Sequence, residues 1–272
     1  MRGNRQSESH GGVFVVDFEK QEVEQLFDWN ESEIDLKGSS GDRDLRGIAF
    51  NDEEILAAPG FDSLLAYDLD TKEYVWGFHL LRQYGEWVGH KFDPRTDKGP
   101  LPVNEYHINM VHVDNSGIYL GGMRTNALLH LNNKMEVSQV CSLPAGAHNA
   151  RPYRDGLLFN DTESNCIRYV GRDDKNIAFK IATYDEGDIE FADTDDSNAS
   201  RQGFGRGLCT LGDRFVAGGL SPATISLYDL ESEQKVGSVN LTMDITFLCS
   251  ASSAQILHYR TGELAALRRQ IQ

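Results

Sequence analysis

The chain has 272 residues, of which 40% are hydrophobic and 25% are charged, and these proportions are typical of a globular protein. Its formal net charge of −16 argues against a nucleic-acid or anionic-membrane partner, because both require a concentrated basic surface. No apolar run approaches the roughly 18–20 residues that cross a bilayer, and the polar segment 1–12 lacks the apolar core of a secretory signal. We therefore expect a cytoplasmic protein.

A short phrase recurs five times along the chain: an apolar strand that ends in a small or polar residue, a polar turn and a second strand. A repeat unit of about forty residues made of short strands is the signature of a propeller blade. The repeat predicts an all-β fold, a β-propeller that forms one domain over residues 1–272, with five blades. A six-bladed ring, with one blade degenerate inside an insertion, is the alternative count. The copies of the phrase begin at residues 13, 64, 128, 167 and 225.

In chain order, segment 12–29 predicts the two outer strands of a split blade, whose inner strands come from 245–259. Pairing of the two chain ends in one sheet would close the ring and remove exposed strand edges. Four complete blades are predicted between these ends, each beginning with an inner strand. They span residues 45–78, 107–143, 148–183 and 206–242.

Two long insertions interrupt the repeat, at 79–104, rich in aromatic and basic residues, and at 184–204, which is acidic. A shorter one spans 30–44. All three connect the outermost strand of one blade to the innermost strand of the next, so we expect them on one face of the propeller. Long connections within a compact domain are more often functional than neutral.

The predicted inner strands begin with Arg46, His107, His148 and Arg206, which we interpret as equivalent places in four blades. Charged and imidazole groups are costly to bury without partners, so a ring of them around the axis predicts a binding site in an axial pocket. The structural alternative is that these side chains hydrogen-bond neighbouring blades together.

Two chemistries compete for this ring. In the first, His107 and His148 bind a divalent metal together with Asp161, or serve as catalytic acid–base groups. Imidazole ligands suit zinc, iron, nickel or copper, and calcium is the oxygen-ligand alternative. His79 and His90, in or beside the first insertion, are further candidates to cap the pocket.

In the second chemistry, guanidinium groups bind the carboxylate or phosphate of a small anionic substrate in bidentate fashion. The two chemistries can coexist in one pocket. The predicted substrate-binding residues are Arg46, Arg206, Asn109, Asn149 and Arg151.

The phrases at 45–50, 107–109, 147–152 and 158–162 resemble those of a group of uncharacterised bacterial β-propeller proteins. More distantly, the chain is similar to lactonase-type and streptogramin-lyase-type propellers, which place a divalent metal on the axis. The expected function is a small-molecule-binding propeller; if it is an enzyme, we expect a metal-dependent hydrolase or lyase acting on an anionic substrate, because a metal-bound water needs few other residues. The alternative function is a non-catalytic binding or scaffold propeller that engages a protein or a glycan through its elaborated face.

Overall fold

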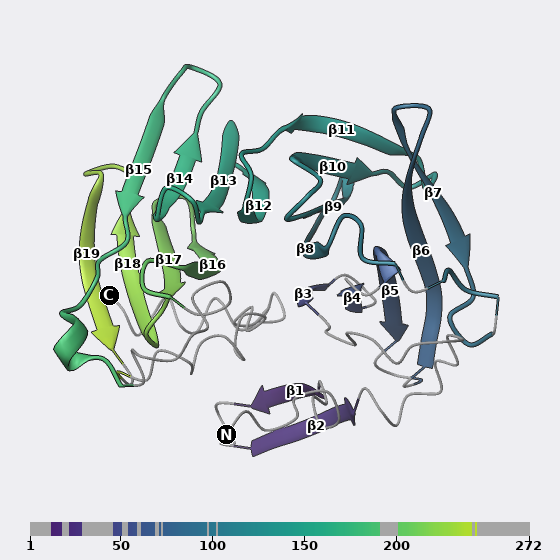
Figure 1. Cartoon of the computed structure of the whole chain (residues 1–272), viewed down its shortest axis with the longest axis horizontal. Helices are drawn as coiled ribbons and strands as arrows, with labels where there is room; N and C mark the ends of the chain where they lie inside the picture. Colours follow the sequence, from purple (N-terminus) through teal and green to yellow (C-terminus); the bar gives the residue numbers. More distant parts are fainter. Residues whose placement is uncertain are drawn as a thin grey trace.

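A computed structural model describes residues 61–68, 71, 73–96, 98–101, 103–190, 201–240 and 243, together with the backbone of four strands between residues 12 and 58. Apart from a short 3-10 helix at Glu186–Asp188, the regular elements of the described residues are β-strands. They form consecutive antiparallel sheets that follow one another around a central region, which is the arrangement of a β-propeller (Figure 1). No helix within the described ranges has the length and apolar character to cross a membrane.

Four sheets have four or more strands, and each is a meander in which sequence neighbours pair. The first contains β3 (Arg46–Phe50), β4 (Glu54–Ala58), β5 (Ser63–Asp68), β6 (Glu73–Gln83) and β7 (Glu86–Phe92). The second contains β8 (Ile108–Asp114), β9 (Gly117–Gly122), β10 (Ala127–Leu131) and β11 (Val137–Ser142). The third contains β12 (Ala147–Tyr153), β13 (Gly156–Asp161), β14 (Cys166–Val170) and β15 (Asn176–Lys180). The fourth contains β16 (Gly205–Leu211), β17 (Phe215–Leu220), β18 (Thr224–Asp229) and β19 (Gln234–Asn240).

The predicted split blade is represented by one hairpin, in which β1 (Gly12–Asp17) pairs with β2 (Glu22–Asp28). The segment 245–259, predicted to supply the inner strands of this blade, lies outside the described residues. The described part of the chain therefore contains four sheets of blade size and a two-stranded sheet. Closure of the ring by both chain ends, and with it the count of five or six, stays a prediction.

The first insertion differs from its expected form, because much of it is a β-hairpin. Strand β6 continues to Gln83, and β7 adds a fifth strand to the first sheet. The loop consists of Tyr84 and Gly85, at φ 52° and 89°. Two positive φ angles are those of the type I′ turn, whose twist matches that of the flanking strands. Figure 1 shows this hairpin at the outer edge of its sheet.

In three of the four large sheets, the recurring phrase has a local explanation in the turn that follows the third strand. Asp68, Asn132 and Asp229 each accept a hydrogen bond at Oδ1 from a main-chain N–H two or three residues ahead, at 2.8, 2.9 and 3.0 Å. Such side chains replace a main-chain acceptor and stabilise tight turns. The repeated polar residue therefore ends each strand and starts the hairpin.

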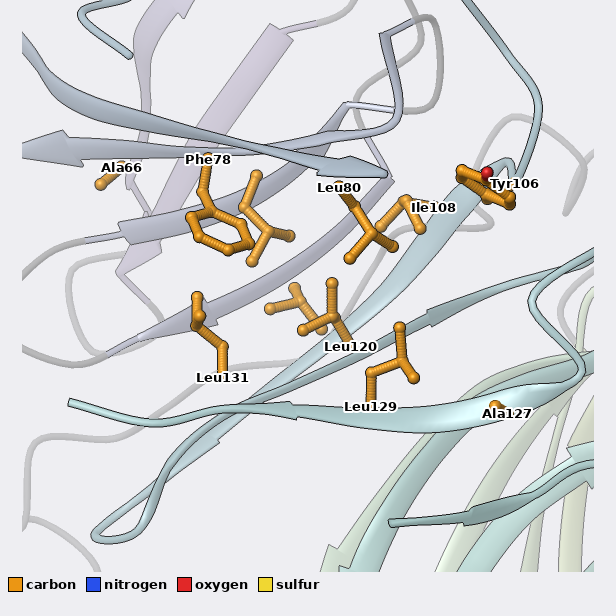
Figure 2. Close-up of a cluster of buried hydrophobic side chains, with 11 residues drawn as sticks. Ala66, Phe78, Leu80, Tyr106, Ile108, Leu120, Ala127, Leu129 and Leu131 are labelled. Atoms are coloured by element: carbon orange, nitrogen blue, oxygen red, sulfur yellow. The ribbon is translucent and has the colours of Figure 1, made fainter. Parts of the chain in front are cut away.

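The hydrophobic core lies between successive sheets. Figure 2 shows Phe78 and Leu80 of β6 facing Leu120, Leu129 and Leu131 of the second sheet, and all five are almost fully buried. A second cluster joins the second and third sheets, and a third joins the third and fourth sheets. Each blade is thus stabilised by burying apolar side chains against its neighbours.

Strands β3, β8, β12 and β16 are edge strands that contact one another in that order, β3 with β8, β8 with β12 and β12 with β16. They lie on the inner side of the sheets in Figure 1, and they coincide with the predicted inner strands. Each is interrupted by a register shift near its start, at Gly47, Asn109 and Arg206, and between His148 and Arg151. A bulge of this kind re-aims side chains, and bulges are frequent beside functional sites.

Candidate functional site

His107 does not occupy the blade position of His148 and Arg206, so the predicted equivalence of these residues is wrong. The carbonyl oxygen of His107 accepts a hydrogen bond, at 3.3 Å, from the residue that follows β9. The carbonyl oxygen of Phe204 accepts the matching bond, at 3.2 Å, from the residue that follows β17. Phe204 is therefore the counterpart of His107, while Asn109, the extra residue of β8, is the counterpart of Arg206.

His107 is held in place by Asp62 of the preceding sheet. The Asp62 carboxylate accepts hydrogen bonds from the N–H groups of Glu105, Tyr106 and His107, at 2.6, 2.9 and 2.8 Å. Nδ1 of the His107 ring lies 3.0 Å from Oδ1 of Asn104. Burial raises the pKa of Asp62, although its main-chain donors act in the opposite direction. This arrangement connects two blades through a buried carboxylate.

His148 lies on β12 and contacts Arg206 of the next inner strand. Nη1 of Arg206 lies 2.6 Å from Nε2 of His148, and Nδ1 of His148 lies 2.7 Å from the carbonyl oxygen of Gly146. A guanidinium group only donates and a carbonyl only accepts, so Nε2 accepts and Nδ1 carries the hydrogen. The imidazole is neutral in this geometry, and the pair joins neighbouring blades as the structural alternative expected.

The Arg206 guanidinium also lies over the ring of Phe204, 4.6 Å from its centroid. A second guanidinium, that of Arg201, lies 4.1 Å from the same centroid. Arg201 is fixed by hydrogen bonds to Oδ1 of Asn165 and the carbonyl oxygen of Thr162, at 2.7 and 2.8 Å. Phe204 and His148 therefore hold the position of Arg206, which is 9% exposed.

The predicted metal-ligand set of His107, His148 and Asp161 is not assembled. The Asp161 carboxylate accepts hydrogen bonds at 3.2 and 3.0 Å from Nε and Nη2 of Arg168, which lies on the neighbouring strand β14. Both ring nitrogens of His148 are engaged within the protein, as described above. The described part of the chain contains no group of three or more His, Cys, Asp or Glu side chains that could hold a metal ion.

Arg151 crosses from β12 to β16 in the opposite sense to Arg206. Its Nη2 donates to the carbonyl oxygen of Leu208 at 2.9 Å, and its Nε approaches that of Asn149 at 3.5 Å. Desolvation by burial lowers the pKa of Arg151. Among the described residues, no carboxylate pairs with this guanidinium. Arg151 is half-buried, and an anion beside it would offset the cost of partly desolvating a cation that has no counter-ion.

Three asparagines lie on or beside the inner strands: Asn149 on β12, Asn160 on β13 and Asn109 on β8. Asn149 has a left-handed backbone at φ 56°, which asparagine tolerates better than most residues. Asn160 lies directly opposite His148 on β13, so the two side chains share a face. Oδ1 of Asn160 and both amide atoms of Asn109 are buried without a hydrogen-bond partner among the described residues. Buried polar atoms in this condition often mark the place of a water or a ligand.

Arg46 is the first residue of β3 and pairs with Ala57 of β4. Its backbone thus stands at the start of an inner strand, as predicted, while its side chain lies outside the described residues. The structure brings His148 and Arg206 into contact, and it places Arg151 and Asn149 in the bulged segment of β12 that also carries His148. His107 stands at a different position of its blade, equivalent to Phe204.

No protein-family model matches the chain, and a comparison with curated proteins finds no match. Among solved structures, virginiamycin B lyase from Staphylococcus aureus has a TM-score of 0.43 and 12% identity, covering 74% of this chain and 57% of the lyase chain. The WD40 β-propeller domain of Doa1 has a TM-score of 0.46 and 13% identity, covering 76% of this chain and 71% of its own. At these scores the likenesses transfer no chemistry to this chain.

Proposed function

We propose that the protein binds a small anionic molecule where the inner strands β12 and β16 meet. Arg151 and Arg206 are the groups that would contact its carboxylate or phosphate. The principal support is Arg151, a half-buried guanidinium whose hydrogen bonds in the described residues go to main-chain carbonyl oxygens alone. Guanidinium groups bind carboxylate and phosphate through paired N–H donors, which matches this requirement.

The two guanidinium groups come from adjacent inner strands and are fixed by different contacts. Arg206 is oriented by His148 and Phe204, whereas Arg151 is oriented by the carbonyl oxygen of Leu208. Side chains whose rotamers are fixed before binding lose less conformational entropy when a ligand arrives. Two fixed guanidinium groups would favour a doubly charged anion over a singly charged one.

The proposal concerns binding and includes no catalytic step. His148, the predicted acid–base group, has Nε2 occupied by Arg206 and Nδ1 occupied by Gly146. In the metal-dependent hypothesis, Asp161 was to complete a metal shell with His107 and His148, and its carboxylate is bound by Arg168.

Isothermal titration of the full, untagged chain with inorganic phosphate and with succinate tests the proposal, with succinamide as the uncharged control. Replacing Arg151 by Gln should weaken phosphate or succinate binding by about 10- to 150-fold, the equivalent of a charged hydrogen bond of roughly 1.5–3 kcal/mol. Arg172→Gln, which removes an exposed guanidinium, should leave the affinity unchanged. Arg151→Lys keeps the charge but removes the fork, and should recover only part of the loss.

Circular dichroism establishes that each variant is folded before it is titrated. Binding of neither anion by the unaltered chain would contradict the proposal and would favour the scaffold function instead. Equal affinity in the unaltered chain and in Arg151→Gln would contradict it as well.

A further inference from the structure

Two histidines face each other on the β6–β7 hairpin, away from the inner strands. His79 of β6 and His90 of β7 are direct partners in the antiparallel register. Directly opposite residues project from the same face of a sheet, with Cβ atoms about 4.5–5.5 Å apart. At that separation two imidazole rings can direct one nitrogen each at a single ion, at the 2.0–2.1 Å typical of metal–imidazole bonds.

The ring of His79 is already oriented for such a role. Its Nδ1 lies 2.8 Å from the carbonyl oxygen of Phe61 and 3.3 Å from Oγ of Ser63. Because the carbonyl oxygen only accepts, Nδ1 carries the hydrogen, and the lone pair of the neutral ring is on Nε2. Histidines that bind metals almost always donate their other N–H to a carbonyl or carboxylate in this way.

The electrostatic surroundings favour a cation at this pair. Asp62, whose side chain is buried, directly follows Phe61, the acceptor of the His79 ring, and the chain as a whole has a formal charge of −16. His90 is exposed, so an ion from solution would reach it without opening the hairpin.

The two cross-strand pairs that flank His79 and His90 on the same face of the sheet are apolar. Gly77 pairs with Phe92 on one side, and Leu81 pairs with Val88 on the other. The Phe92 ring covers Gly77 so closely that a Cβ atom there would lie 2.3 Å from it. An apolar border limits water around a metal site and so tunes its chemistry.

We propose that His79 and His90 form a two-histidine site for a divalent transition metal, with water molecules as the remaining ligands. Copper(II) should bind more tightly than nickel(II) or zinc(II), following the general order of divalent affinities for nitrogen ligands. This site is separate from the proposed anion site, and neither depends on the other.

Titration of the full, untagged chain with copper(II) chloride, followed by calorimetry and electron paramagnetic resonance, tests the proposal. We expect about one bound copper per chain, with nitrogen hyperfine structure from imidazole ligands, and weaker binding of zinc(II). His90→Gln changes an exposed side chain and should fold normally, yet it should abolish this binding, as should His79→Gln. The matched control, His130→Gln, changes another strand histidine and should retain it.

Unaltered copper affinity and an unaltered spectrum in His90→Gln would overturn the proposal. So would copper binding by the unaltered chain that is no tighter than binding by the doubly substituted chain.

Discussion

The guanidinium of Arg214 beside Asp229 holds the pKa of that carboxyl far below its usual range. The two groups form a bidentate pair, with Nε and Nη2 at 2.9 and 2.7 Å from the carboxylate oxygens. The same carboxylate accepts a hydrogen bond from Oγ of Ser232 at 2.9 Å, and so also fixes the turn after β18. Asp229, which belongs to the repeated phrase, therefore both pairs with Arg214 and stabilises the turn after β18.

Stability should depend on pH through Asp229. Its folded-state pKa is lowered, so its contribution is fully present above the unfolded pKa of about 4 and is lost as pH falls below that value. Asp229→Asn should therefore destabilise the chain at pH 7 and match the unaltered chain more closely as pH decreases. Urea unfolding between pH 7 and pH 3 measures this.

Asp188→Asn is the control for that experiment, because it removes an exposed carboxylate from the 3-10 helix. Its effect on the free energy of unfolding should be small at both ends of the pH range. A difference between Asp229→Asn and the unaltered chain that stays constant with pH would exclude the charge pair as its cause.

At the scale of elements, the β6–β7 hairpin depends on two glycines over which aromatic rings lie. A Cβ atom at Gly89 would lie 2.0 Å from the ring of Phe78, which is 1% exposed. The ring belongs to the core between the first two sheets, so it has no room to move away. Because Gly89 has no side chain, the Phe78 ring can lie against the backbone of β7.

Gly89→Ala should destabilise the chain by about 1–3 kcal/mol, the usual cost of overpacking a core. Gly237→Ala in β19 is the matched control, because a Cβ atom there meets nothing within 4 Å. We expect it to be neutral or stabilising by roughly 0.4–1 kcal/mol. Chemical denaturation measures both, and equal effects of the two changes would contradict this role of Phe78.

The elements show what periodicity can and cannot predict. The repeated apolar strands and polar turns were sufficient to identify the four strands of each large sheet. The hairpin at Tyr84 and Gly85 was missed, because a short loop with positive φ angles has only one glycine to indicate it. His107 was misplaced because it was aligned with His148 by residue type, whereas the main-chain hydrogen bonds align it with Phe204.

At the scale of the molecule, stability resides in the interfaces between sheets. Leu158 is fully buried in the cluster that joins the third and fourth sheets. Leu158→Ala should lower the free energy of unfolding by about 2–5 kcal/mol, through lost burial and a residual cavity. Leu211→Ala, at a side chain that is 51% exposed, should change it by no more than about 0.5 kcal/mol.

Equilibrium urea unfolding followed by fluorescence and by circular dichroism checks this prediction. Because each blade packs on its neighbours, both probes should report one transition in Leu158→Ala as in the unaltered chain. Two separated transitions would mean that the sheets unfold independently, contrary to a core shared between them.

The candidate site was predictable in composition but not in its contacts. Arg151, Arg206 and His148 were identified from their places at inner strands; the structure joins His148 to Arg206 and links Arg151 to the carbonyl oxygen of Leu208 on β16. The sequence could not indicate that Nε2 of His148 accepts from Arg206, because that contact links residues 58 positions apart. Phe204, which lies beneath the Arg206 guanidinium, was not identified as a site residue.

The account depends most on an anion that binds between Arg151 and Arg206, and a crystal of the full chain soaked in selenate tests it most directly. Anomalous scattering from selenium would locate the ion without reference to the surrounding density. We predict a selenium peak within hydrogen-bond distance of both guanidinium groups, and its loss in Arg151→Gln. Selenate that is found elsewhere on the molecule, with none at the junction of β12 and β16, would contradict the proposed function.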